Sequence, residues 1–479
     1  MIQVHPDVQA LYERVNQVIR QAGGRPLLVG GCVRDILLGL TPCDLDLEVY
    51  GLEATALVNA LRHDFPVDLV GQDFGVLKIR HAPIDISLPR RESKRGLGHR
   101  GFEVFSDPWM SFQDAAARRD FTINAMGLDP VTDELLDPFG GQQDLAHRTL
   151  RHTSVHFDED PLRVLRGMHF ISRFGLTVVP ETIALCRRLL PEYGSLAVER
   201  VWTEWEKWAG QATHPSLGLQ FLHDTGWLAV YPELGGLQGC PQDPQWHPEG
   251  DVWTHTLYVV DEAARVAQRD SLTREERRLL VLAALCHDLG KPATTAMIDG
   301  HLRSRGHTDC DRIVESFLQR LGAPKVVMTR IIALVRHHLS HTHFAGSPRH
   351  VRRLTRTLEE SGETLRMLAR LVEADASGRP PLPRQMPPSM QEMLTLAENL
   401  HVSEQGPRPL VLGRHLIVVG VPPGPMMGCL LKEAYDAQLD GEFETVESGL
   451  TWLKARGLLI ASSGTTMDKE GSNGEALKS

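Results

Sequence analysis

The sequence predicts an α+β protein, with strands and helices mixed in the first 150 residues and helices in the remainder. Short apolar segments of strand type occupy residues 26–29, 45–49 and 81–88. From about residue 151 onward the segments are longer and begin as helices do, for example with an acidic turn followed by Pro161. A Pro-rich stretch at 378–390 indicates a linker within this second part.

Composition narrows the class of protein. With 479 residues, of which 42% are hydrophobic, the chain can form two to four domains. No apolar run approaches the roughly 18 residues of a membrane span, and the first residues lack the layout of a secretion signal, so we expect a cytoplasmic protein without a membrane partner. The seven cysteines form no C-x-x-C pair, which argues against a zinc knuckle or a disulfide framework. The formal net charge of −10 argues against non-specific coating of nucleic acid but allows a local basic groove.

The first motif combines a glycine turn with two acidic residues. Gly30 and Gly31 follow a strand-like segment and open a helix-like one, which favours an anion near the helix start, with Arg34 as a fixed positive charge. Asp44 and Asp46 share one face of a strand because they are two residues apart. Neighbouring carboxylates repel unless a cation lies between them, and Mg²⁺ usually binds one or two carboxylates together with substrate phosphates. This segment therefore predicts a Mg²⁺-dependent phosphoryl- or nucleotidyl-transfer site.

A basic segment follows at residues 89–101, with five cations, one Glu and three glycines. This composition predicts a flexible basic loop, which either handles phosphates or is an ordinary solvated loop. Its cations are candidates for RNA contacts: Arg90, Arg91, Lys94, Arg95 and Arg100. Asp85, in the strand-like segment just before this loop, is a further candidate ligand of the head metal.

Two more polar groups suit a nucleotide. On a helix, Asp120 and Asn124 would share a face, and with the neighbouring Arg119 they offer an acceptor, an amide and a guanidinium for sugar and phosphate oxygens. Further along, three residues are spaced by three near the start of the next helix: Asp160, Arg163 and Arg166. Spacing alone favours an ion pair between the first two, worth only about 0.2 to 0.5 kcal/mol.

The second half of the chain contains a different motif. His255, the pair His287-Asp288 and Asp375 occur in the order H…HD…D. Imidazole nitrogens and carboxylate oxygens together suit a divalent cation such as Mg²⁺, Mn²⁺ or Ni²⁺. The order resembles the HD phosphohydrolase superfamily, and this resemblance implies a metal site with hydrolytic activity. Further candidate ligands are His307 and His338, and the alternative is a set of helical surface histidines.

Several motifs together resemble one family. LVGGCVRDILLG with DLDLE, RRDFTINAM, LLDPFGGQQDL, EDPLRVLRGMHFISRF and VERVWTEW occur in the order typical of the class II tRNA nucleotidyltransferases, the CCA-adding enzymes. The resemblance covers residues 25–210 and implies a head of the polymerase β type with a small mixed sheet, and tRNA, CTP and ATP as partners. It implies metal binding and catalysis by Asp44 and Asp46. It also implies nucleotide binding by Gly30, Gly31, Arg34, Arg119, Asp120, Asn124, Asp160, Arg163 and Arg166.

In this family the residues that match Asp160 and Arg163 serve as a protein template for the incoming base. An ionised Asp only accepts hydrogen bonds and an Arg only donates them, so the pair suits an amino group beside an unprotonated ring nitrogen. Cytosine and adenine present that edge. Uracil and guanine reverse donor and acceptor, which costs about 1 to 3 kcal/mol for each buried group left unpaired.

The resemblance leaves alternatives open. Bacterial poly(A) polymerases are close relatives, but the HD motif and a tail without a basic run favour a CCA-type enzyme. A CC-only or A-only enzyme remains an alternative, and the basic loop argues mildly against CC-only addition. An alternative of another class is an HD phosphohydrolase whose head only binds RNA. One departure from the family is His415, where HD-containing members commonly have Asp.

The expected organisation has five segments, and no protein partner is implied. Residues 1–150 form the nucleotidyltransferase head and 151–240 a helical neck with the base template. Residues 241–395 form an HD domain, 396–462 a C-terminal helical segment and 463–479 a disordered tail.

Overall fold

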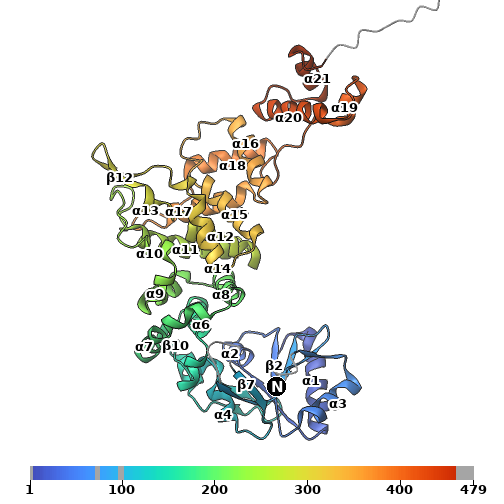
Figure 1. The fold of residues 1–479 in the computed structure, drawn as a ribbon, viewed down its shortest axis with the longest axis vertical. Coiled ribbons are helices and arrows are strands. Elements are labelled where there is room, and N and C mark those ends of the chain that lie inside the picture. Colours follow the sequence, from blue (N-terminus) through green and yellow to red (C-terminus); the bar gives the residue numbers. More distant parts are fainter. Residues whose placement is uncertain (1–3, 71–75, 95–101, 460–479) are drawn as a thin grey trace, which may run out of the picture. The chain divides into compact units, whose positions relative to one another are not determined.

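The computed structural model describes residues 4–70, 76–94 and 102–459 (Figure 1). Contacts between Cα atoms divide the chain into two compact units. The first unit comprises Met1–Arg336 with Glu373–Gln385, and the second comprises His337–Val372 with the residues from Met386 onward. The five-segment division expected from the sequence stays a prediction.

The head contains a seven-stranded sheet in the order β3-β4-β5-β2-β1-β8-β9. β2 and β5 are parallel and every other pair is antiparallel, so the predicted mixed sheet is confirmed. Leu45, Leu47 and Val49 of β2 are buried, as expected for a strand that packs one face against a core. The strands are β1 Arg25–Val29, β2 Leu45–Tyr50, β3 Val67–Val70, β4 Val76–Ile79, β5 Ile84–Ser87, β8 Gly127–Leu128 and β9 Leu135–Leu136. The helices of the head are α1 Pro6–Gln21, α2 Gly31–Leu37, α3 Ala54–Asp64, α4 Phe112–Ala117, η2 Thr122–Asn124 and α5 Gly141–Ala146.

The basic segment is not wholly a loop, which corrects the expectation from composition. Its first part forms β6 (Arg90–Lys94), which pairs with β7 (Phe102–Ser106) in an antiparallel ladder. Aromatic and β-branched residues such as Phe102, Val104 and Phe105 favour a strand, and this strand pairs with the segment that contains Arg90, Arg91 and Lys94. Residues 95–101 between the two strands, with Arg95 and Arg100, lie outside the described residues.

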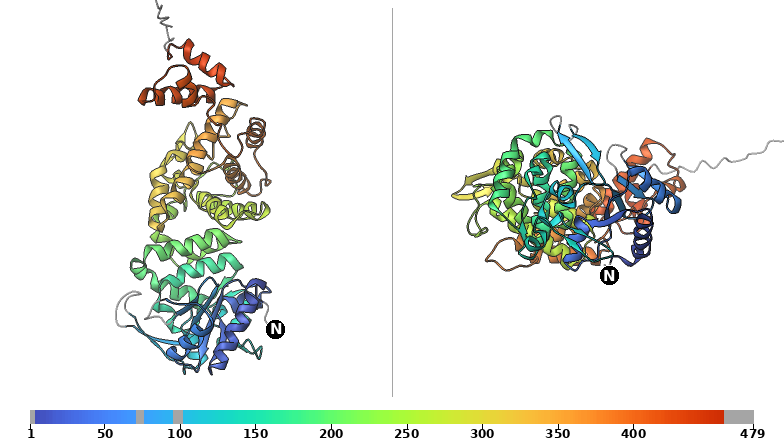
Figure 2. Two further views of the ribbon diagram at one scale, coloured as in Figure 1. Left: turned by 90° about the vertical axis from the view of Figure 1, so that its right-hand side faces the viewer. Right: turned by 90° about the horizontal axis from the view of Figure 1, so that it is seen from below.

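Helices follow the head. Trp205, Trp208, Trp227 and Tyr231 are fully buried. Trp205 packs edge to face against Trp208 and Tyr231, and Tyr193 does so against Trp227 and Tyr231. The helices between residues 162 and 224 pack side by side and are drawn in green in Figure 2. The elements are β10 Thr149–Leu150, η3 Val155–Glu159, α6 Leu162–Phe174, β11 Thr177–Val178, α7 Pro180–Leu189, η4 Leu190–Ser195, α8 Val198–Gln211, α9 Pro215–Asp224, η5 Trp227–Val230 and α10 Pro232–Gly235.

The remainder of the first unit is helical apart from one hairpin. α11 begins at an Asp251 cap, and α12 begins at a capping box in which Thr273 and Glu276 exchange hydrogen bonds with each other's backbone N–H groups. The elements are α11 Val252–Arg269, α12 Arg274–Cys286, α13 Lys291–Thr294, β12 Thr295–Ile298, β13 His301–Ser304, η6 His307–Asp309 and α14 Asp311–Leu321. α15 (Lys325–His337) and α17 (Leu365–Ser377) each have residues in both units.

The second unit has its own apolar core around Leu416, Leu430 and Leu453. Its remaining helices are α16 Pro348–Glu360, α18 Pro388–Asn399, α19 Gly413–Val418, α20 Pro425–Asp440 and α21 Val446–Ala455. His415 Nδ1 accepts the Leu412 N–H at 3.1 Å, so this imidazole caps the start of α19. The predicted linker is irregular up to Pro387, and the expected disordered tail lies outside the described residues. None of the helices in the described part of the chain is long and apolar enough to span a membrane.

Candidate functional site

Three carboxylates meet where the parallel strands β2 and β5 begin. Asp44 precedes β2 directly and Asp46 is its second residue, so the predicted strand brings both to one place. In the parallel pairing of β2 with β5, Asp46 lies directly opposite Asp85. The Asp85 carboxylate in turn accepts a hydrogen bond from Lys78 Nζ at 2.8 Å. Register therefore places the third candidate ligand next to the first two.

The negative charges of these three carboxylates suit a divalent cation. The pKa of Asp46 lies above its usual value, first because protein atoms exclude water from the carboxylate and second because Asp85 is negative; Arg119 opposes the shift, and Asp44 adds to it. A cation bound between these oxygens would relieve the repulsion. Oxygen ligands of this kind are those that Mg²⁺ prefers.

Gly30 and Gly31 leave open space beside Asp46. Gly30 has φ +76° and ψ −135°, a conformation that side chains rarely adopt, and it caps the start of α2. A Cβ atom at Gly30 would lie 3.6 Å from Arg119 Nη1 and 3.9 Å from Asp46 Oδ2. Any larger side chain would fill the space in front of the carboxylate.

Arg34, from α2, is buried and held in one orientation. Its guanidinium is paired with Asp35, with 2.7 Å between Nη2 and Oδ1, and donates to the Asn124 amide oxygen. It also lies over the rings of Phe170 and Phe174 from α6, at 5.2 and 4.7 Å from their centroids. The Arg34 guanidinium therefore contacts residues of both the head and α6.

Asp120 and Asn124 are together, but not on one helix as expected. α4 ends at Ala117 and the chain turns before η2, and Asn124 Nδ2 still donates to Asp120 Oδ1 at 3.0 Å. Arg166 of α6 donates its Nε–H to Asp120 Oδ2 at 2.7 Å. Burial would raise the pKa of Asp120, but the Arg166 charge and the hydrogen bond from Asn124 hold it below its usual value. Asp120 is therefore an anchor that is ionised at neutral pH.

Asp160 and Arg163 lie at the start of α6, with partners that sequence did not predict. Asp160 Oδ2 accepts a hydrogen bond from Arg200 Nη2 at 2.7 Å, and its Oδ1 accepts the Leu162 N–H at 3.1 Å. Arg163 donates to the backbone carbonyls of His156 and Arg118. These contacts fix both side chains independently of each other.

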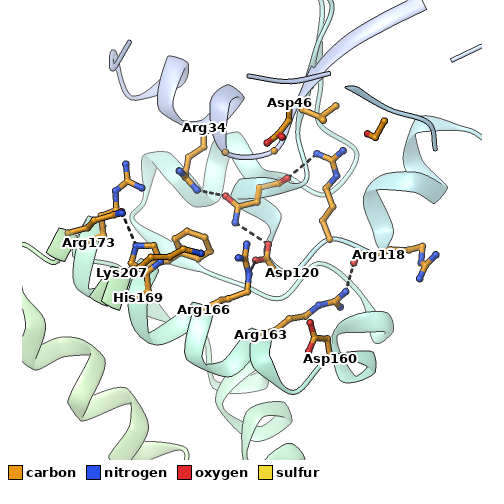
Figure 3. A pocket seen from close by; sticks show the side chains of 18 of the residues that line it. Arg34, Asp46, Arg118, Asp120, Asp160, Arg163, Arg166, His169, Arg173 and Lys207 are labelled. Carbon is orange, nitrogen blue, oxygen red and sulfur yellow. Dashed lines mark hydrogen bonds and ion pairs between the residues drawn. The ribbon is translucent and has the colours of Figure 1, made fainter. Parts of the chain in front are cut away.

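Of the residues predicted to bind the triphosphate, the base and their metal ion, all except Asp44 and Asp85 line one cavity of about 640 Å³ (Figure 3). Most of its ionisable groups are cations, as a site for a triphosphate requires. Eight lining residues were not among the predicted site residues: Val29, Ser87, Arg118, His169, Phe170, Arg173, Lys207 and Gln211. The only sequence signal for the helical ones was spacing, since Arg166, His169 and Arg173 repeat along α6, and Lys207 and Gln211 are four apart on α8. A solvated helix face shows the same spacing. Of the basic segment, Arg90 lines the cavity, and the side chains of Arg91 and Lys94 lie outside the described residues.

The four residues of the H…HD…D motif form one buried cluster, as predicted. His255 lies in α11, His287 and Asp288 follow the end of α12, and Asp375 lies in α17. His255 Nε2 is 3.1 Å from Asp375 Oδ1, 3.3 Å from His287 Nε2 and 3.7 Å from Asp288 Oδ2. The alternative of helical surface histidines is wrong.

The donor set of this cluster fits a divalent metal ion. Burial would raise the pKa of both carboxyls, but His287 and Lys291 hold the pKa of Asp288 well below its usual range, and Arg379 does the same for Asp375. Lys291 Nζ lies 2.7 Å from Asp288 Oδ2. Two ionised carboxylates and two imidazoles are typical ligands for Mn²⁺, Ni²⁺ and related ions.

Residues around this cluster extend it. His307 Nε2 is 3.5 Å from Asp288 Oδ1, so the first unit contains one of the two further candidates. His338 lies in the second unit, and its role stays a prediction. Sequence reasoning missed Glu249, whose Oε1 is 2.8 Å from Nδ1 of both His247 and His255. Burial would raise the pKa of Glu249, but these contacts lower it to about 2.

Comparison with known proteins gives the same two parts. Residues 27–151 match the model of the poly A polymerase head domain, and residues 252–374 match the HD domain. A multifunctional CCA protein of Xanthomonas campestris is 44% identical over 273 residues, which are 56% of this chain and 63% of that protein. One from Vibrio cholerae is 40% identical over 317 residues, 65% of this chain and 75% of that protein. The crystal structure of the Bacillus stearothermophilus CCA-adding enzyme with CTP has the same fold, with a TM-score of 0.64, 23% identity and coverage of 95% of this chain and 98% of that one.

Proposed function

The chain belongs to the bacterial class II CCA-adding enzymes with an HD domain, the family of the multifunctional CCA proteins, and on that premise we propose that it adds C and A nucleotides from CTP and ATP to the 3′ end of tRNA. The addition needs no nucleic-acid template. Addition of the full CCA end is the proposal, and CC-only or A-only addition is the alternative within the family.

One observation supports this function above all others. The cavity brings together the metal-ligand carboxylate Asp46, the Gly30-Gly31 turn and the Asp160 and Arg163 pair. A metal and triphosphate site therefore opens into the same space as a base-reading pair. A head that only bound RNA would not need Asp44 and Asp46 beside each other.

Different residues would have different tasks in the reaction. Asp44 and Asp46 would hold Mg²⁺, and this ion would supply positive charge that neutralises the phosphates. The tRNA 3′-hydroxyl would attack the α-phosphorus, lose its proton to water and displace pyrophosphate. Arg34 and Arg119 add fixed positive charge along the triphosphate. Asp160 would accept the base amino group, while Arg163 would donate to the unprotonated ring nitrogen.

The test is incorporation of labelled CTP and ATP into tRNA that lacks its 3′ end, with products resolved to single nucleotides. Asp46→Ala should abolish incorporation of both labels, because it removes a charge that holds the metal. Asp64→Ala is the matched control, since this head carboxylate is paired with Arg14 and lies outside the cavity. Wild-type protein that incorporates neither label would refute the proposal, and products that end after CC would identify the CC-only alternative.

A second activity is proposed for the HD cluster, namely metal-dependent hydrolysis of phosphate esters such as 2′,3′-cyclic phosphates. The buried carboxylate and imidazole set described above supports it. Wild-type protein supplied with Mn²⁺, Ni²⁺ or Mg²⁺ should hydrolyse 2′,3′-cyclic AMP and lose this activity with a chelator. If none of the three ions supports hydrolysis, the proposed second activity is refuted.

A further inference from the structure

Glu249 lies in the irregular segment before α11, and its carboxylate is enclosed between two imidazoles. No part of its side chain is exposed, and Oε1 is 2.8 Å from both His247 Nδ1 and His255 Nδ1. We infer that Glu249 is a positioning residue that orients His255 as a ligand for a divalent cation in the HD cluster. The inference rests on the metal site proposed above and adds residues outside the H…HD…D motif.

The contact determines which nitrogen of His255 faces the metal ligands. An acceptor at Nδ1 keeps the proton there, so the Nε2 lone pair is available on the opposite side of the ring. That side holds His287, Asp288 and Asp375, all within 3.7 Å of His255 Nε2. A carboxylate behind a metal-bound imidazole both fixes the ring and raises its basicity, and its loss typically costs 10- to 100-fold in metal affinity.

His247 stabilises the same carboxylate from the other side. Its ring packs edge-on against His255, with 4.8 Å between centroids and 79° between planes. The second oxygen, Glu249 Oε2, is buried and has no hydrogen-bond partner among the described residues. Oε1 therefore makes both contacts, and loss of the carboxylate would affect both rings at once.

A competing arrangement is a separate metal site made of His247, Glu249 and His255. Their ligand atoms lie close enough together to hold an ion. That site would use His255 Nδ1, the atom that faces Glu249, and the same imidazole would then have to bridge two ions. The separate site predicts two ions per chain, whereas the positioning role of Glu249 predicts one.

Substitution at Glu249 should leave a folded protein. The Gly378 carbonyl is 3.3 Å from His255 Nδ1 and offers this N–H another acceptor. Glu249→Gln keeps an amide oxygen in the place of the carboxylate oxygen, whereas Glu249→Ala removes it. The matched control is Glu262→Gln, which alters another buried carboxylate, one paired with Arg265 on the same α11 helix.

The experiment measures Mn²⁺ binding to the full-length chain by calorimetry, with ion counts by mass spectrometry. All variants are made in an Asp44→Ala, Asp46→Ala background, which removes the ligands of the head site. We expect one ion per chain, with 10- to 100-fold weaker affinity in Glu249→Ala and a smaller loss in Glu249→Gln. Thermal unfolding without metal should be the same in both variants and in Glu262→Gln within a few degrees.

Three results would overturn the inference. Equal Mn²⁺ affinity in the background protein and in its Glu249→Ala variant would show that Glu249 has no influence on the metal ligands. A fall from two ions to one, with the remaining affinity unchanged, would make Glu249 a ligand of its own site. Equal losses in Glu249→Ala and Glu262→Gln would indicate a general effect of a lost buried charge. Absence of Mn²⁺ binding in the background protein itself would instead refute the proposed HD metal site.

Discussion

Asp160, just before α6, is held by Arg200 at the start of α8, whose Nη2 lies 2.7 Å from Asp160 Oδ2. The backbone N–H of Leu162 holds the other oxygen. The carboxylate is therefore fixed in the cavity wall before a nucleotide binds. This pre-organisation is what a base-reading acceptor requires, since a mobile carboxylate would also accommodate the wrong base edge.

Removal of the Asp160 carboxylate should reduce discrimination before it reduces catalysis. Asp160→Ala loses the acceptor for the amino group, while Arg163 and the metal ligands stay. One hydrogen bond to a charged group is worth roughly 1.5 to 3 kcal/mol, or about a 10- to 100-fold loss of preference for CTP over UTP. Competition between labelled CTP and UTP measures it. A wild-type ratio would identify Asp160 as a structural carboxylate, and Arg163→Ala should weaken CTP and ATP use together.

The contact with Arg200 should itself affect specificity. Arg200→Gln frees the Asp160 carboxylate without removing it, so we expect the preference for CTP over UTP to fall by less than in Asp160→Ala. The same competition assay measures the change. Arg187→Gln, at an exposed arginine of α7 that donates to the Asp224 carbonyl, is the control. If Arg200→Gln kept full discrimination, pre-organisation by this ion pair would be irrelevant.

Asp85 allows a graded test of the head metal site. It lies opposite Asp46 but is paired with Lys78, so part of its charge is already compensated. We expect Asp46→Asn to abolish nucleotide addition and Asp85→Asn to raise the Mg²⁺ concentration needed for half-maximal rate. A Mg²⁺ titration of the initial rate separates these effects. An Asp85→Asn enzyme with an unchanged Mg²⁺ requirement would remove Asp85 from the set of ligands.

Local sequence rules identified the residues that depend on local geometry. Asp44, which directly precedes β2, and Asp46 within β2 are two residues apart and line one pocket with Asp85, and Gly30 is favoured by a positive φ angle. The H…HD…D order likewise predicted the buried cluster. Each of these features is determined within a few residues or by a recurring motif.

Contacts between helices could not be predicted in the same way. Arg200 and Glu204 reach α6 only because α8 packs against it, about 40 residues later in the chain. The pairing of Asp120 with Asn124 was expected on a helix, but the chain turns after Ala117 and the two meet through η2. Spacing alone predicted an ion pair between Asp160 and Arg163, but in the structure Asp160 pairs with Arg200 of α8.

The two proposed activities should separate by mutation. His287→Ala with Asp288→Ala removes two ligands of the HD cluster and should end metal-dependent hydrolysis of 2′,3′-cyclic AMP while CTP and ATP addition continues. Because Lys291 would lose its buried partner, Asp288→Asn is a second variant that keeps an acceptor for it. Both assays are run on the same preparations. Loss of nucleotide addition in a protein with a normal unfolding transition would contradict separate sites.

The lowered pKa of Glu204 predicts how the stability of the protein depends on pH. Glu204 is buried on α8, and burial alone would raise its pKa, but the His169 ring, whose Nδ1 lies 3.7 Å from Glu204 Oε2, and the charges of Arg166 and Lys207 lower the pKa to about 2 from its usual 4.5. A carboxyl with a depressed pKa stabilises the folded state above pH 4.5, and this contribution is lost as the pH falls toward 2. The shift corresponds to about 3 kcal/mol.

Glu204→Gln should therefore be less stable than wild type by about 3 kcal/mol at pH 7, and the difference should shrink steadily between pH 4.5 and 3. Urea unfolding followed by tryptophan fluorescence measures this, since Trp202, Trp205 and Trp208 lie on the same helix. Glu199→Gln is the control, because this exposed carboxylate in the first turn of α8 should contribute at most about 1 kcal/mol through the helix dipole. A Glu204→Gln deficit that stayed constant from pH 7 to pH 3 would show that packing, and not the ionised carboxylate, is what the substitution removes.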